Sequence, residues 1–126
     1  MTPASRNPIP DRLGIALSGL CALHCLALPF AVTLVPVLAS SALGTLAGAE
    51  WFHAALLVPV TLVSGTVLGR RALKSAWLAA LLVSALFAMT GALFVGEEWL
   101  EKALTLGGAG LLMFAHGLGL YARRAG

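Results

Sequence analysis

Two thiols and an imidazole lie close together in the first long apolar stretch of the chain, within the run Cys21-Ala22-Leu23-His24-Cys25. On an α-helix, Cys21, His24 and Cys25 fall within an arc of about 100° on one face. Thiolate and imidazole groups favour soft and borderline cations such as Hg(II), Cu(I), Zn(II) and Cd(II). Because ionisable side chains within a membrane span are by default functional candidates, we predict that these three residues are metal ligands.

Two further histidines, His53 and His116, extend this set. We estimated the depth of each candidate from the basic residues that end the apolar stretches, at a rise of ~1.5 Å per residue. In this estimate, His53 lies nearest to one face of the membrane. Cys25 and His24 lie in the centre, and Cys21 and His116 lie nearest to the other face. Transport needs stations that bind a cation and still release it. A ladder of two-ligand stations therefore suits transport better than one closed four-ligand site.

Each of these features also has a structural interpretation. A buried cysteine is commonly a small apolar filler, and a histidine at the depth of His53 is often solvated or caps a helix. A histidine among glycines, as at His116, can hydrogen-bond to a neighbouring helix. Glu97, Glu98 and Glu101 form either an acidic mouth that concentrates cations or an ordinary solvated turn. The sequence leaves these alternatives open.

Composition indicates an integral membrane protein. Of the 126 residues, 60% are hydrophobic and 10% are charged, whereas soluble domains have about 25% charged residues. The mean hydropathy is +0.96. The formal net charge of +3 does not predict nucleic-acid binding, because the basic residues follow the ends of apolar stretches. The two cysteines are predicted to be free thiols, since a bridge between residues four apart would strain a helix.

Four apolar stretches are each long enough to cross a bilayer, which takes about 20 residues. We predict an all-α membrane protein, a bundle of four transmembrane helices preceded by a short cytoplasmic tail at residues 1–12. The membrane domain is expected over residues 13–124. The predicted spans are residues 13–38, 51–69, 76–96 and 103–122.

The basic residues predict the orientation of these spans. Seven of the eight Lys and Arg residues lie in the N-terminal tail, the second turn or the C-terminus, and only Lys102 lies in another turn. By the positive-inside rule, both termini are predicted to be cytoplasmic. Small residues such as Gly14 and Ser18 predict close helix packing, and the GxxxG pair of Gly65 and Gly69 is one candidate seam for a homodimer.

The first span resembles the first helix of MerC-type proteins. The resemblance rests on Asp11-Arg12-Leu13-Gly14, on Ser18 and on Cys21-Ala22-Leu23-His24-Cys25-Leu26-Ala27-Leu28-Pro29. Weaker matches are Trp51-Phe52-His53 and Ala115-His116, and together they cover about residues 11–124. The resemblance implies a multi-pass protein of the bacterial inner (cytoplasmic) membrane, associated with mercuric-ion uptake. It also implies that Cys21 and Cys25 are the mercury-binding pair, with His24 beside them.

One difference from that family concerns the C-terminus. Members from mercury operons carry a second cysteine pair in a C-terminal extension, whereas this chain ends at Gly126 without further cysteines. The chain is therefore expected to be a short form. Zn(II), for which imidazole ligands at His53 and His116 are better suited than for Hg(II), is the alternative cation.

Three other functions are weaker predictions. Haem ligation by His24 and His116 is disfavoured because their estimated depths differ by ~7 Å. A bundle that only stabilises a partner complex would make the cysteines incidental. No serine, acid or phosphate-loop pattern predicts an enzyme. We expect no permanently bound cofactor, the transported Hg(II) or Zn(II) as ligand, the lipid bilayer as partner, and no nucleic acid.

Overall fold

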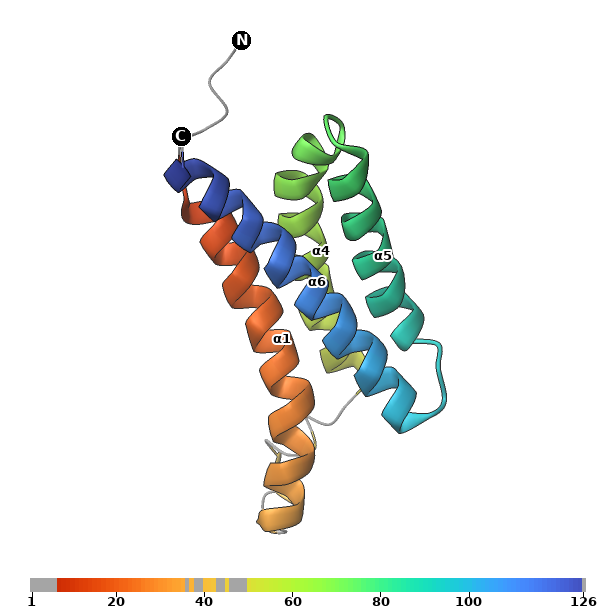
Figure 1. Ribbon diagram of the computed structural model, residues 1–126. Coiled ribbons are helices and arrows are strands. Elements are labelled where there is room, and N and C mark those ends of the chain that lie inside the picture. The colour runs from red at the N-terminus through yellow and green to blue at the C-terminus, as the bar shows by residue number, and fades with distance from the viewer. Residues whose placement is uncertain (1–6, 36, 38–39, 43–44, 46–49, 126) are drawn as a thin grey trace.

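The structure is a computed structural model of the chain, and it describes residues 7–35, 37, 40–42, 45 and 50–125. Four helices account for most of these residues: α1 (Ile9–Leu34), α4 (Glu50–Ala72), α5 (Ala76–Ala92) and α6 (Glu98–Ala125). They form one bundle (Figure 1). The predicted all-helical fold with four main helices is therefore confirmed for the part of the chain that the structure describes.

The helices extend beyond the apolar stretches that predicted them. α1 begins at Ile9, just after Pro8, with Pro10 in its first turn, where a proline needs no amide partner. α4 continues to Ala72 and holds Arg70 and Arg71 in its last turn, where positive charge suits the helix dipole. Residue 38, the predicted end of the first span, and residues 1–6 of the predicted tail lie outside the described residues.

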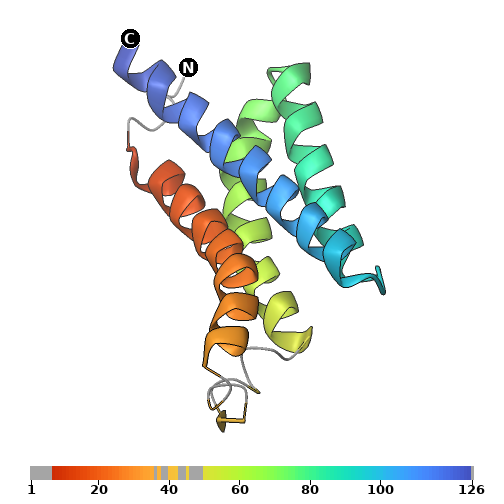
Figure 2. The same ribbon diagram turned by 60° about the horizontal axis from the view of Figure 1, so that its bottom comes forward.

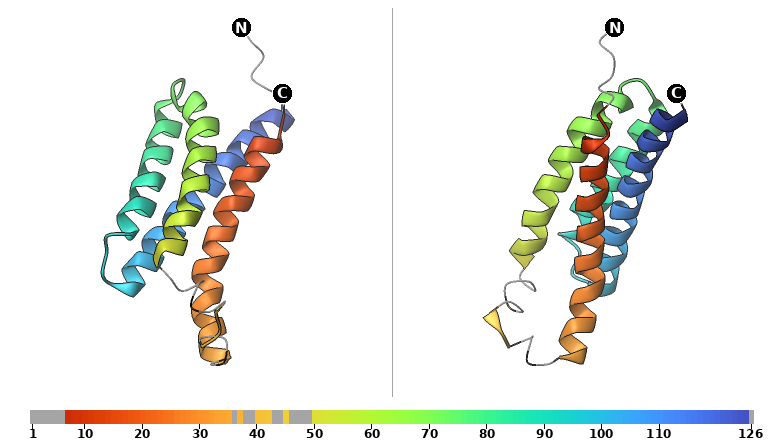
Figure 3. Two further views of the ribbon diagram at one scale, coloured as in Figure 1. Left: turned by 180° about the vertical axis from the view of Figure 1, so that it is seen from behind. Right: turned by 90° about the vertical axis from the view of Figure 1, so that its left-hand side faces the viewer.

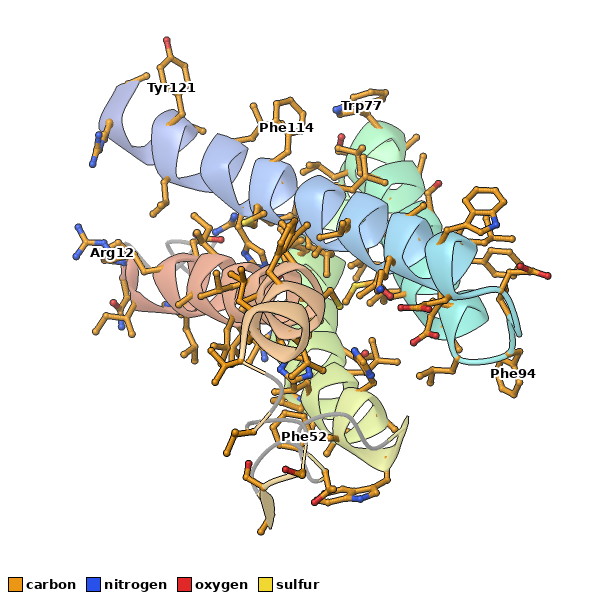
Figure 4. The ribbon with its side chains drawn as sticks, turned by 90° about the horizontal axis from the view of Figure 1, so that it is seen from below. Arg12, Phe52, Trp77, Phe94, Phe114 and Tyr121 are labelled. Carbon is orange, nitrogen blue, oxygen red and sulfur yellow. The ribbon has the colours of Figure 1, made fainter. Side chains whose placement is uncertain are left out.

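Three helices are long and apolar enough to cross a membrane, over Ile9–Leu28, Trp51–Ala72 and Glu98–Ala122. α5 is also apolar but has 17 residues, at the lower limit of the range of about 17–25 for a transmembrane helix. Large apolar side chains cover the outside of the bundle, and Phe94, Phe114 and Tyr121 point away from it (Figure 4). A surface of this kind suits lipid, and the protein is a membrane protein.

The helices pack in the order α1, α6, α5, α4, and α4 also contacts α1 (Figures 1 and 2). The first turn of α1, the last turn of α6 and the connection between α4 and α5 lie at the same end of the bundle (Figure 3). The basic residues that the structure describes, other than Lys102, therefore gather at this end, which we call the terminal end.

The buried face of α1 is made of small and polar side chains. Its buried residues recur every three or four positions, at Asp11, Gly14, Ser18, Cys21 and Cys25, which is the spacing of a single helix face. Most of the leucines of α1 are exposed instead, and Leu17 and Leu28 are partly buried. The face that carries the two cysteines therefore points into the bundle.

Candidate metal-binding site

The two cysteines lie one turn apart on the buried face of α1. Both are free thiols, their side chains are 3% and 5% exposed, and the Cys21 thiol interacts with that of Cys25. Sγ of Cys25 also lies 3.6 Å from Nε2 of His53, within the distance of a sulfur hydrogen bond. This contact links the middle of α1 to the first turns of α4.

His24 joins the same group through ring contacts. Its ring centroid is 5.1 Å from that of His53 and 5.1 Å from that of Phe52, which lies on the side of α4 nearest α1 (Figure 4). Four of the five predicted ligands, Cys21, His24, Cys25 and His53, are thus brought together by two helices. Their role in metal binding remains a prediction.

The arrangement of these groups is open. Among the described residues, no three His, Cys, Asp or Glu side chains lie close enough together to hold one metal ion. The close pairs are Cys21 with Cys25, and Cys25 with His53. Pairs of this kind can hold a cation through two ligands, but they do not form the four-ligand cage of a structural zinc site.

A small pocket lies beside the thiols, and residues of all four helices line it. α1 contributes Cys21, and α4 contributes His53 and Leu57. α5 and its C-cap residue supply Met89 and Leu93, and α6 supplies Glu101 and Thr105. Cys21 is therefore the thiol that borders the pocket, and the other walls come from the neighbouring elements.

His116 lies in a different polar group, toward the terminal end. It is fully buried, its Nδ1 is 3.1 Å from Oδ1 of Asp11, and its Nε2 is 3.2 Å from Oγ of Ser64. An ionised carboxylate can only accept hydrogen bonds, so Nδ1 of His116 donates to Asp11. In the neutral ring, Nε2 then accepts from the Ser64 hydroxyl. Both ring nitrogens of His116 are therefore engaged by protein groups.

Arg71 completes this group, which we call the Asp11 network: Asp11, Ser64, Arg71 and His116. The guanidinium donates to both carboxylate oxygens of Asp11, at 3.0 and 2.7 Å, in the bidentate geometry that favours strong ion pairs. The network joins α1, α4 and α6. Its signals in the sequence are Asp11, directly before an apolar stretch, and Arg71, which by itself indicates only the orientation of the spans.

Two glycines make room for the Asp11 network. A Cβ atom at Gly14 would collide with the imidazole of His116, and one at Gly119 would collide with the guanidinium of Arg71. The order carboxylate, imidazole, hydroxyl is that of a hydrolase triad. Ser64, however, is 0% exposed, so a substrate has no access to its hydroxyl, and this geometry favours a tie between helices.

The geometry defines a helical membrane protein with a thiol and imidazole group inside its bundle. The chain matches the family of the MerC mercury resistance protein over residues 11–121, so most of its length is covered. It therefore belongs to the MerC family, a family of membrane proteins of mercury resistance and metal transport rather than of enzymes. Searches of curated proteins and of solved structures gave no match.

Proposed function

We propose that the protein carries Hg(II) across the bacterial inner membrane toward the cytoplasm, using Cys21 and Cys25 as a thiolate pair. The observation that carries this proposal is the contact between three groups on two helices. Two free, buried thiols lie one turn apart on α1, and His53 of α4 lies 3.6 Å from the second of them. Soft thiolate ligands are the groups that favour thiophilic cations.

The histidine contact gives the site a way to release thiol protons. A thiol must lose its proton to bind a metal ion. Nε2 of His53 lies at hydrogen-bonding distance from Sγ of Cys25, so the imidazole is placed to accept this proton as the sulfur binds the cation. His24, whose ring contacts that of His53, is the next imidazole available to the cation.

The open geometry supports transport rather than storage. A cation held by two ligands leaves more easily than one enclosed by four, and conduction needs binding of intermediate strength. His116 is not part of the proposed ligand set, because Asp11 and Ser64 engage both of its ring nitrogens. The proposed path therefore runs through the thiolates of Cys21 and Cys25, with His24 beside them. His53 can act as a ligand only after it has passed on the proton taken from Cys25, because both nitrogens of a protonated ring carry hydrogen.

We propose that all four helices span the membrane and that the terminal end is cytoplasmic. Basic residues gather at this end, with Arg12, Arg70 and Arg71 among them, as the positive-inside rule requires. α5, at 17 residues, covers ~26 Å at 1.5 Å per residue. That length nearly matches a hydrocarbon core of about 30 Å.

Zn(II) is the second candidate cation. The contact between Cys25 and His53 pairs sulfur with nitrogen, a combination that zinc accepts. Hg(II) remains the first candidate because the described residues form pairs of ligands rather than a group of three or more.

We also keep a homodimer as a proposal. A Cβ atom added at Gly65 or at Gly69 would meet no described atom within 4 Å, so packing within the chain does not use this GxxxG face. A close helix approach in a second copy would use it. Cross-linking in membranes through a cysteine placed at position 65 tests this pairing.

Uptake into proteoliposomes tests the transport function. We expect Hg(II) uptake by the wild type and background uptake by the double variant Cys21→Ser/Cys25→Ser. Ser18→Ala is the matched control, because Ser18 lies on the same buried face of α1 and is not a proposed metal ligand. This variant should retain uptake. Bound metal after exposure to Hg, Zn, Cu and Cd identifies the preferred cation, and unchanged uptake in the double variant would end the proposal.

A further inference from the structure

The pocket beside Cys21 contains two donors that the proposed thiol and imidazole path does not use. Glu101 of α6 and Met89 of α5 line it together with Cys21 and His53. A carboxylate attracts cations of every kind, whereas a thioether is a soft ligand that favours soft cations. The pocket thus contains a carboxylate that attracts any cation and a thioether that favours soft cations.

Met89 reaches this pocket through space left by a glycine. Its side chain is 2% exposed, and a Cβ atom at Gly108 of α6 would collide with its Cγ and lie 3.3 Å from its Sδ. The flexible thioether of a buried methionine often only fills a gap in a core. Here the same side chain also lines a pocket whose other walls include a thiol and an imidazole.

Glu101 differs from its acidic neighbours in the same turn. Glu98 is paired with Lys102 and Glu97 is exposed. Glu101 is half-buried, lines the pocket, and interacts electrostatically with His53. Glu101 and Thr105 lie one turn apart on α6, so both face the pocket from the same side of that helix.

We propose that this pocket is a cation-binding station that shares Cys21 with the thiol pair: Glu101 attracts the cation, and Met89 together with Cys21 selects a soft one. The proposal rests on the transport function proposed above and adds a substrate class, soft thiophilic cations in preference to borderline ones. Glu101, His53 and Cys21 do not form a close group of three, so the cation passes from the carboxylate to the sulfur ligands in succession.

Selectivity tests the role of Met89. Initial rates of Hg(II) and Zn(II) uptake into proteoliposomes are compared for wild type, Met89→Leu and the control Met113→Leu. Leucine keeps the volume and removes the sulfur, and Met113, on α6, is not among the residues that line the pocket. We expect the ratio of Hg(II) to Zn(II) rates to fall by about tenfold in Met89→Leu, a loss typical for groups around a metal, and to stay unchanged in Met113→Leu.

Two other results for Met89→Leu would overturn the proposed role of Met89 in selectivity. An equal loss of both rates in Met89→Leu would assign Met89 a packing role and overturn the selectivity proposal. Unchanged rates would overturn it as well. Absence of uptake in the wild type would remove the transport function itself, which separates that failure from a failure of the pocket proposal.

The dependence of the uptake rate on ionic strength tests the proposed attraction of cations by Glu101. We expect Glu101→Gln to lower the uptake of Hg(II) and Zn(II) alike at low salt, and to weaken the dependence of the rate on salt, because attraction by a charge is screened by ions. Glu97→Gln, in the exposed part of the same turn, is the matched control and should behave as wild type. Equal effects of the two variants would overturn the role of Glu101.

Discussion

Two polar groups lie on the same buried face of α1, and they differ in how completely their hydrogen bonds are made. In the Asp11 network, the carboxylate, both nitrogens of His116 and the Arg71 guanidinium are joined by contacts of 2.7–3.2 Å. In the thiol group, α1 and α4 meet through a longer sulfur to nitrogen approach of 3.6 Å and the ring contacts of His24, beside a pocket. Under the proposed function, the polar residues of one helix would thus serve two purposes.

A structural group therefore differs from a candidate binding site in how completely protein atoms satisfy its hydrogen bonds, and not in its polarity. A buried group whose partners are all protein atoms gains stability from them and has little capacity left for a ligand. A group with weak partners gains little stability and keeps its capacity to bind. Mutations in the two groups should therefore separate stability from transport.

The largest expected loss of stability follows from removal of the carboxylate of Asp11. Asp11→Ala leaves Arg71 and His116 without their shared partner, and breaking a buried ion pair costs about 3 kcal/mol or more. Arg12→Ala, at the exposed neighbouring position, is the control and should change little. Reversible unfolding in mixed micelles measures the free energy, and equal values for the two variants would contradict a structural network.

A smaller loss is expected when Gly14 is replaced by alanine. The added methyl group would displace the imidazole of His116, and overpacking of this kind costs about 1–3 kcal/mol. Gly65→Ala meets no described atom within 4 Å and should be neutral or stabilising by up to about 1 kcal/mol, because alanine favours helix. The same unfolding assay compares them, and an unperturbed Gly14→Ala would show that the network tolerates displacement.

The smallest effect on stability is expected at Cys25. Serine can keep a hydrogen bond to His53 in place of the weak sulfur contact, so Cys25→Ser should change the free energy of unfolding by less than about 1 kcal/mol. Uptake of Hg(II) should nevertheless fall to background, because the thiolate pair is lost. If Cys25→Ser instead unfolds readily but still transports Hg(II), the thiol group would be structural, contrary to this expectation.

Much of this architecture was predictable from the sequence. The spacing of Gly14, Ser18, Cys21 and Cys25 predicted the buried face of α1, and the depth estimates placed His53 and Cys25 at adjacent levels. The Asp11 network was not predicted because its members lie on three helices, and contact between them depends on helix rotation that apolar length does not specify. The predicted bounds place Asp11 in the cytoplasmic tail and Arg71 in the turn after the second span, although both residues lie within helices.

The sequence did not single out Met89 and Glu101, the two further donors proposed for the pocket, for a related reason. Met89 stands in an apolar helix and resembles a core residue, and Glu101 resembles its exposed neighbours. Their convergence on Cys21 depends on the contacts of α5 with α6 and of α6 with α1. Sequence patterns describe one helix at a time and do not contain this information.

The small, polar face of α1 has a mechanical consequence. With most of its leucines turned outward, α1 is tied to α4 by side-chain hydrogen bonds at two heights, Asp11 with Arg71 and Cys25 with His53. A cation that takes the Cys25 sulfur changes the second link and leaves the first in place. We therefore expect cargo binding to alter the packing of α1 against α4 near Cys25, while Asp11 keeps the first turns of α1 anchored.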